Sequence, residues 1–233
     1  MRFEISQEVF AALPDACFGA VAVRGVNNSL PRPEIEAMLA ESIALCETAL
    51  RDVRVKLSPE IIPYRNAFIA LGINPNKYMC SIEALLTRIS KGKGFPHISP
   101  IVDLGNAVSL KYRLPIGAHD LGTIPNALEV RPAREGDSFI PFGGTEAELP
   151  ELGEVIYVSD AQVRTRRWTW RQSELGKIDA DTHDLLFPID GFTTLNLDRV
   201  LAARTELAES IERLFGASTE TALLDAAHPV FEL

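Results

Sequence analysis

The densest group of cationic and aromatic side chains in the sequence is RTRRWTWRQ, at residues 164–172. It holds four arginines, two tryptophans and no acidic residue, in a chain with a formal net charge of −9. Arginine binds phosphate oxygens, and tryptophan stacks on unpaired bases. The alternative is a surface strand held flat by cation–π contacts, with at least one tryptophan in the core. We predict a local RNA-binding site that consists of Arg166, Arg167, Trp168, Trp170 and Arg171.

A histidine followed by an aspartate, His119 and Asp120, forms a second candidate site. A histidine can orient a water molecule or contact a ribose, whereas the alternative is a turn in which Asp120 caps a short helix. Asn106 can hydrogen-bond a substrate, or it can be a buried structural amide. The sequence has no Gly-x-Ser-x-Gly signature and no evident histidine partner for a cysteine, so it indicates no covalent nucleophile. The predicted catalytic residues are His119, Asp120 and Asn106.

Several glutamates are candidate anionic groups of a binding pocket. A carboxylate can bind an ammonium or guanidinium group of a substrate, and the alternative for each glutamate is plain exposure to solvent. The candidates are Glu83, Glu146, Glu148 and Glu174, with Glu83 and Glu174 preferred.

The composition excludes several classes of protein. At 233 residues, with 46% hydrophobic and 24% charged residues, the chain is long enough for one large globular domain, 1–233. The net charge argues against a general nucleic-acid coat but permits a local basic site. Three separated cysteines predict reduced thiols and a cytoplasmic location, and neither a signal peptide nor a membrane span is expected. The four histidines lack ligand spacing, so we predict no metal and no cofactor.

Hydrophobic periodicity predicts the elements that position these residues. Helical spacing predicts helices at 33–52, 58–72, 81–89, 100–113 and 196–215. Apolar or alternating runs bounded by Gly, Pro and Asp predict strands at 18–26, 127–132, 137–144, 153–160, 163–172 and 184–192. Alternation along the strand at 163–172 would place Trp168 and Trp170 on the same face as Arg164 and Arg166.

An ordered series of segments over roughly residues 60–192 carries a family resemblance. The segments are YRNAFIALGINPNKYMCSIEALLTRISKGKGFPHISPIVDLGNAVSLKYRLPIGAHDL, EVRPAREGDSFIPFGG, LGEVIYVSDAQV and RRWTWRQ. The series resembles the B3/4 domain, the editing module of the bacterial phenylalanyl-tRNA synthetase β subunit, which also occurs as free-standing proteins. The resemblance implies an α+β fold, with a mixed β-sheet, a barrel-like core and flanking helices. The hydrophobic pattern also predicts a C-terminal helical tail at 196–233. It also implies hydrolysis of the ester that joins a wrong amino acid to tRNA.

The chain departs from the synthetase pattern at two places. The synthetase domain has a histidine in the segment that matches 115–120, where this chain has Gly117. It has a small, Gly-rich run where this chain has 166–172, followed by an acidic residue whose nearest counterpart here is Glu174. We therefore predict that Gly117, Glu83 and Glu174 face the substrate and that the amino-acid specificity differs.

Three functions remain open at this point. The leading interpretation is a deacylase that hydrolyses misacylated tRNA in trans. Its substrate would carry a cationic residue, such as the arginine analogue canavanine, or a tyrosine-like aromatic residue. The second interpretation is an RNA-binding module of the same fold without hydrolysis, because Gly117 replaces the family's histidine. The third is a hydrolase of a small ester or amide.

Overall fold

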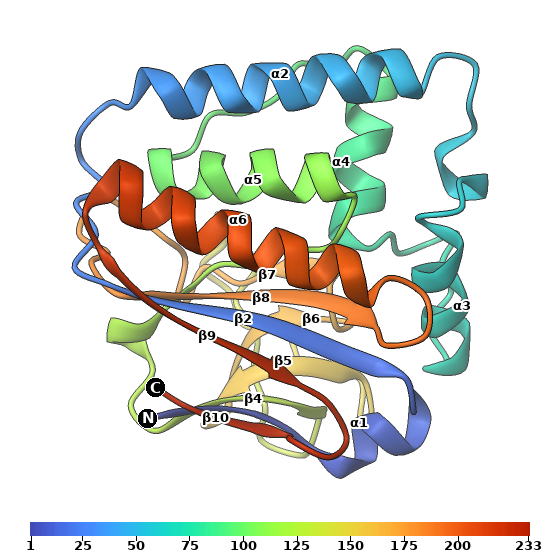
Figure 1. Ribbon diagram of the computed structural model, residues 1–233. Helices are drawn as coiled ribbons and strands as arrows, with labels where there is room; N and C mark the ends of the chain where they lie inside the picture. The colour runs from blue at the N-terminus through green and yellow to red at the C-terminus, as the bar shows by residue number, and fades with distance from the viewer.

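The computed structural model describes residues 1–233 and contains two open β-sheets and six α-helices (Figure 1). The smaller sheet has the strand order β3-β8-β2-β9, and the larger has the order β10-β1-β4-β5-β6-β7. The strands of the smaller sheet are β2 (Ala16–Arg24), β3 (His119–Asp120), β8 (Leu185–Phe192) and β9 (Ser218–Leu224). Those of the larger sheet are β1 (Arg2–Ile5), β4 (Ala127–Pro132), β5 (Val155–Ser159), β6 (Gln162–Arg166), β7 (Arg171–Gln172) and β10 (Val230–Glu232).

The buried centre of the smaller sheet is formed by β2 and β8, with the sequences ACFGAVAVR and LLFPIDGF. Every residue of the two strands except Arg24 is buried. Strands covered on both faces consist of nearly continuous apolar residues, because neither face meets water. Asp190 is the one carboxylic acid in these two strands, so its burial calls for a specific reason.

Three long helices are stacked over one side of the smaller sheet (Figure 1). They are α2 (Pro33–Ala49), α5 (Pro100–Tyr112) and α6 (Leu197–Phe215). The buried residues Val200, Ala203, Leu207 and Ile211 recur at helical spacing along α6 and face the sheet. Gly19 and Gly191 allow this close packing, because a Cβ on either one would collide with the side chain of Val200.

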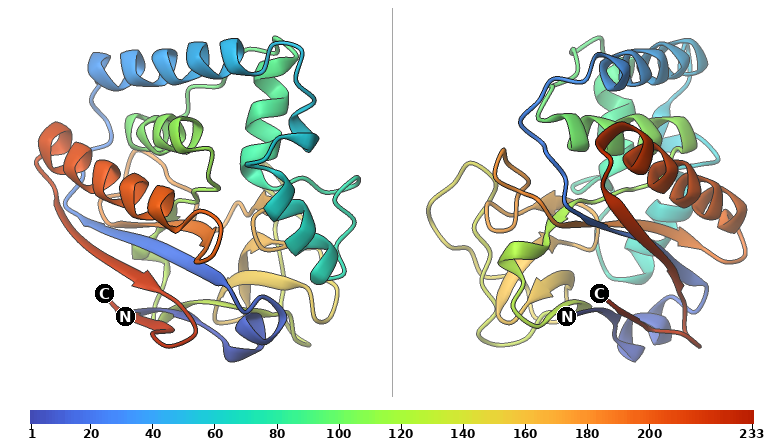
Figure 2. Two further views of the ribbon diagram at one scale, coloured as in Figure 1. Left: turned by 45° about the vertical axis from the view of Figure 1, so that its right-hand side comes forward. Right: turned by 60° about the vertical axis from the view of Figure 1, so that its left-hand side comes forward.

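The remaining three α-helices are shorter. They are α1 (Gln7–Ala12), α3 (Ile62–Ala70) and α4 (Ser81–Ser90). The two termini lie side by side, because β10 pairs antiparallel with β1 (Figure 2). α3 and α4 run down one side of the molecule (Figure 2). The Ser81 backbone N–H at the start of α4 donates to the Thr169 carbonyl at 2.8 Å, which ties the helix to the segment between β6 and β7.

The structure confirms the predicted mixture of strands and flanking helices and corrects three local predictions. The predicted single strand at 163–172 is interrupted by a turn at 167–170, where Arg167 and Trp168 have positive φ. The predicted strand at 137–144 forms only isolated bridges. The predicted helical tail at 196–233 is helical only to Phe215, because Gly216 ends the helix and the chain returns as β9 and β10.

Candidate active site

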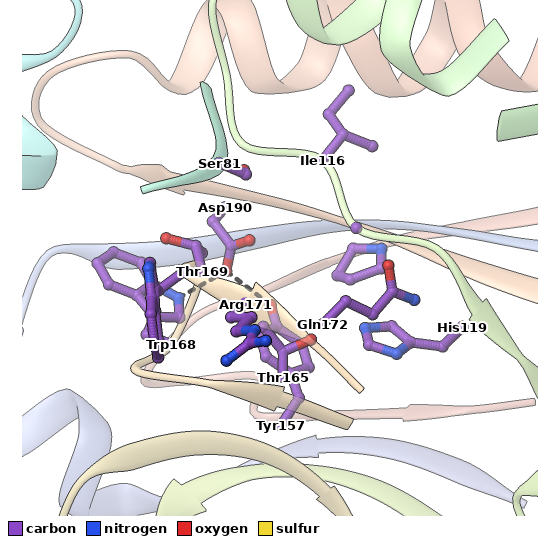
Figure 3. A pocket seen from close by; sticks show the side chains of 13 residues that line it. Ser81, Ile116, His119, Tyr157, Thr165, Trp168, Thr169, Arg171, Gln172 and Asp190 are labelled. Atoms are coloured by element: carbon purple, nitrogen blue, oxygen red, sulfur yellow. Dashed lines mark hydrogen bonds between the residues drawn. The ribbon is translucent and has the colours of Figure 1, made fainter. Parts of the chain in front are cut away.

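A pocket of about 170 Å³ lies where β8 faces the larger sheet. Its walls come from β5, β6, the turn that follows β6, β7, β8 and the start of α4 (Figure 3). The lining residues that carry polar groups are Ser81, His119, Tyr157, Thr165, Trp168, Thr169, Trp170, Arg171, Gln172 and Asp190. The size suits an amino-acid side chain with a few water molecules, each of which needs about 30 Å³.

Asp190 is the only carboxylate in this pocket, and its residue surface is 2% exposed. Its Oδ1 accepts a hydrogen bond from the Tyr157 hydroxyl at 2.6 Å and one from Trp168 Nε1 at 2.7 Å (Figure 3). No other side chain donates a hydrogen bond to Oδ2. Burial raises the pKa of Asp190 from 3.8 to about 7, although both hydrogen bonds favour the charged form. At neutral pH this carboxyl group is therefore close to its midpoint of ionisation. Its Oδ2 is free to bind a ligand or water.

His119 lies beside Asp190's partner Tyr157, and their rings stack at a centroid distance of 5.3 Å. Burial, followed by the nearby Arg164 cation, lowers the pKa of His119 to about 3, so the imidazole is neutral. Its Nδ1 is buried and has no hydrogen-bond partner in the protein, and the same holds for Thr169 Oγ1. A neutral imidazole has one donor and one acceptor nitrogen, and so it can orient a water molecule or a substrate hydroxyl.

Gly117 leaves space next to this imidazole. A Cβ at this position would lie 3.4 Å from His119 Nε2 and 3.3 Å from Pro188 Cγ. Its backbone N–H donates to the Pro188 carbonyl at 3.0 Å, which fixes the segment against β8. Gly117 thus lies in the wall of the pocket, and its role toward a substrate stays a prediction.

Asp190 is the one pocket group that changes charge near neutral pH. Burial raises the pKa of Tyr157 well above 10, and it raises the pKa values of the nearby thiols of Cys17 and Cys80 to about 12. All three groups therefore stay protonated at pH 7, and His119 stays neutral. The buried neutral thiols also make poor nucleophiles.

The Arg/Trp segment forms a hairpin loop, 167–170, between β6 and β7. Arg167 has φ +47° and Trp168 has φ +57°, a left-handed conformation that costs about 1–2 kcal/mol for each residue with a Cβ. Arg166 and Arg167 have buried guanidinium groups, and these are paired with glutamates rather than presented to solvent. This corrects the prediction that these two arginines contact phosphates.

The two tryptophans of the turn have different surroundings. Trp168 is 1% exposed and packs against Tyr64, Phe68 and Phe192, so it is a core residue and cannot stack on a base. Trp170 is partly exposed at the pocket, next to Arg171, whose side chain is 43% exposed. These two residues are therefore the members of the predicted RNA-binding set that a large ligand can reach.

The other predicted site residues lie outside this pocket. Asp120 accepts from the Gly122 N–H at 2.7 Å and from the Thr182 hydroxyl at 2.9 Å, so it is a capping residue and not a catalytic one. Glu83 is buried against Arg65 at 2.7 Å, between α3 and α4. Glu174 pairs with Lys177 and accepts from the Gly143 N–H at 2.9 Å. These contacts correct the predicted catalytic role of Asp120 and leave Glu83 and Glu174 without a place in the pocket.

The predicted catalytic residue Asn106 lines a second, more apolar groove of about 320 Å³. This groove shares a wall with the first pocket, formed by Ser81, Ile116, Gly117, Trp170 and Gln172. Its other walls carry three phenylalanines and the Lys177 ammonium group. The two cavities together form a polar inner site that continues into an aromatic outer groove.

Sequence reasoning missed Asp190, although a signal for it was present. The run LLFPIDGF is apolar except for this residue, and a carboxylate inside a fully buried strand is costly unless it is paired or used. The alternation of polar and apolar residues drew attention to the Arg/Trp segment instead, where charge is abundant but internally neutralised.

The fold matches a known structure of low sequence similarity. An N-terminal fragment of the phenylalanyl-tRNA synthetase β subunit from Pyrococcus horikoshii superimposes with a TM-score of 0.51, at 10% identity, over 93% of this chain and 49% of that chain. At this identity the likeness concerns the fold alone. No helix of the structure combines the length and apolar character that a membrane crossing requires.

The sequence relatives are also β subunits of this kind of enzyme. Phenylalanine–tRNA ligase β subunits from Novosphingobium aromaticivorans and Streptococcus pneumoniae are 31% and 27% identical over 135 and 148 residues. These matches cover 58% and 62% of this chain but only 17% and 18% of those proteins. Residues 63–232 match the B3/4 domain family, and the chain belongs to that family.

Proposed function

We propose that this protein is an aminoacyl-tRNA deacylase that acts in trans on misacylated tRNA. The observation that carries the proposal is Asp190, a buried and partly ionised carboxyl group with one oxygen open to a pocket of amino-acid size. Membership of the B3/4 family supports a role in translation. The cytoplasm would be the place of action, since tRNA is the partner.

The reaction needs a water molecule and no covalent intermediate. Water adds to the ester carbonyl, the bond between that carbon and the ribose oxygen breaks, and the free amino acid and the tRNA hydroxyl are released. We assign the holding of water or the ribose to neutral His119 and the Thr169 hydroxyl; both residues line the pocket, and each has a polar atom without a protein partner. No cysteine lines the pocket, and the nearby thiols of Cys17 and Cys80 stay protonated.

The acceptor end of the tRNA would enter through the aromatic outer groove. Phe95 and Phe142 offer surfaces on which the terminal base can pack, and Asn106 offers hydrogen bonds to it. Arg171 and Lys177 are the cations at the two cavities, and they are the proposed phosphate contacts in place of Arg166 and Arg167.

Asp190 favours a cationic amino acid over an aromatic one. A guanidinium-type group, as in canavanine, would donate to Oδ2 and neutralise the buried charge, which strengthens the attraction in a site of low polarity. A tyrosine-like hydroxyl would supply one donor but no charge. We therefore place a cationic residue first and a tyrosine-like residue second.

The test is a panel of tRNAs charged separately with canavanine, arginine, lysine, tyrosine and phenylalanine. We expect hydrolysis of one class by the wild-type protein and loss of that activity in Asp190→Asn. Glu146, a pocket candidate from the sequence, is exposed and lines neither cavity, so Glu146→Gln is the matched control and should retain full activity. The alternative function, an RNA-binding module without hydrolysis, is favoured by Gly117 at the family's histidine position. Binding of tRNA without turnover of any charged form would establish that alternative.

A further inference from the structure

Glu154 is a buried carboxylate that does not line the pocket but contacts the turn that forms one of its walls. It directly precedes β5, and its side chain is 3% exposed. Its Oε1 accepts from Arg166 Nε at 2.9 Å and from the Arg167 backbone N–H at 3.1 Å. Its Oε2 accepts from Arg166 Nη2 at 2.9 Å. One carboxylate therefore holds the side chain of one arginine and the main chain of the next.

The turn that Glu154 contacts is in an unfavourable conformation. Arg167 and Trp168 both occupy the left-handed region, where residues with a Cβ remain only when their surroundings impose it. The Arg167 guanidinium adds a bond to Glu151 at 2.9 Å and lies 3.9 Å from the centre of the Tyr78 ring. The ionic contacts of the two arginines thus stabilise a turn conformation that residues with a Cβ otherwise disfavour.

The same turn determines where the Trp168 indole points. In this conformation Trp168 Nε1 lies 2.7 Å from Asp190 Oδ1, across the pocket floor. With Tyr157 it occupies both acceptor directions of Oδ1, so that Oδ2 is the oxygen left for a ligand. A different turn would withdraw the indole and release the carboxyl group to rotate.

We propose that Glu154 is a positioning residue for the pocket: it holds the strained turn in the conformation that aims the Trp168 indole at Asp190. The effect on deacylation rests on the proposed function, whereas the effect on the turn and on Asp190 does not. Glu154 would touch neither substrate nor water, and would act through Arg166, Arg167 and Trp168.

The test is Glu154→Gln, which keeps the shape but removes the charge that neutralises the two arginines. The chain has two tryptophans, and both lie in this turn, so intrinsic fluorescence reports on it directly. We expect a changed tryptophan emission and a higher pKa of Asp190, measured by ¹³C NMR, because the charged carboxylate loses its indole donor. If the deacylase activity exists, kcat should fall about 10- to 100-fold while KM for tRNA stays nearly constant.

Glu148→Gln is the matched control. Glu148 also contacts Arg166, at 3.1 Å, but its side chain is 46% exposed, and it lines neither cavity although it was a pocket candidate from the sequence, so all three measurements should stay at the wild-type values. A folded Glu154→Gln protein with parental emission and parental Asp190 titration would overturn the proposal. Should Glu154→Gln not fold, Glu154→Asp retains the charge with a shorter reach, and parental values there would overturn it equally. A wild-type protein without deacylase activity would refute the proposed function, and the emission and titration would still decide the positioning role.

Discussion

Two buried carboxylates, Glu154 and Asp190, differ in what surrounds them. Glu154 accepts from two cationic arginines, and its charge is neutralised within the protein. Asp190 accepts from a phenol and an indole, which are neutral, and its burial is only partly compensated. A buried charge with a full set of ionic partners stabilises a conformation, whereas one with neutral partners keeps part of its binding capacity for a ligand. We therefore propose opposite roles for two carboxylates that are both buried.

The largest expected effect is the loss of stability in Glu154→Gln. The variant leaves two buried guanidinium groups without their shared counter-charge, and the free energy of unfolding should fall by about 3–5 kcal/mol. Glu148→Gln, at the exposed edge of the same network, should change it by less than about 1 kcal/mol. Urea denaturation of both variants measures the difference. Equal losses of unfolding free energy in the two variants would show that Glu154 contributes no more to the ion-pair network than the exposed Glu148.

Asp190→Asn should raise the free energy of unfolding, whereas Glu154→Gln should lower it. The amide keeps an acceptor oxygen for Tyr157 and Trp168 but carries no charge to desolvate, so at pH 8 the variant should be more stable by about 1–4 kcal/mol. The same variant should lose about 100-fold in deacylation of a cationic substrate, because a charge-assisted hydrogen bond is removed. A variant that is less stable and fully active would reverse our assignment of the two carboxylates.

The pH dependence of stability sharpens this comparison. The pKa of Asp190 is raised from 3.8 to about 7, so the folded chain keeps a proton that the unfolded chain has already lost. The stability from this group is fully present below pH 3.8 and is lost as the pH rises to about 7. The slope is at most about 1.4 kcal/mol per pH unit, and it should be missing in Asp190→Asn. Thermal unfolding of both proteins across this window provides the test, and parallel curves would contradict the raised pKa.

The smallest expected effect concerns the exposed arginine. Arg171→Ala should weaken tRNA binding several-fold and reduce the salt slope by about one, as for the loss of one phosphate contact. Arg166→Ala removes a buried pair instead, so it should lower stability while the salt slope of the remaining folded protein stays the same. Filter binding of tRNA over a series of salt concentrations distinguishes the two variants. A reduced slope for Arg166→Ala alone would restore the original RNA-binding assignment.

Sequence patterns located most elements but not the chemistry between them. The helices at 81–89 and 100–113 were predicted nearly to their ends, because their apolar residues follow one face and each begins at a Ser or Pro. The segment at 163–172 was predicted wrongly as one strand, because nothing local indicates two consecutive left-handed residues without glycine. That conformation depends on Glu154, which is 13 residues away from Arg167 and could not be paired with it from the sequence.

The sequence by itself determined the family resemblance, the balance of helices and strands, and the concentration of arginines and tryptophans in one segment. Only the tertiary structure decided which of these charged side chains form ion pairs inside the protein and which remain accessible to a ligand. Asp190 meets Trp168 and Tyr157 across 22 and 33 residues of chain, and burial then raises its pKa. The free energy of a charge depends on the solvent and partners around it, and those are properties of the folded chain rather than of its order of residues.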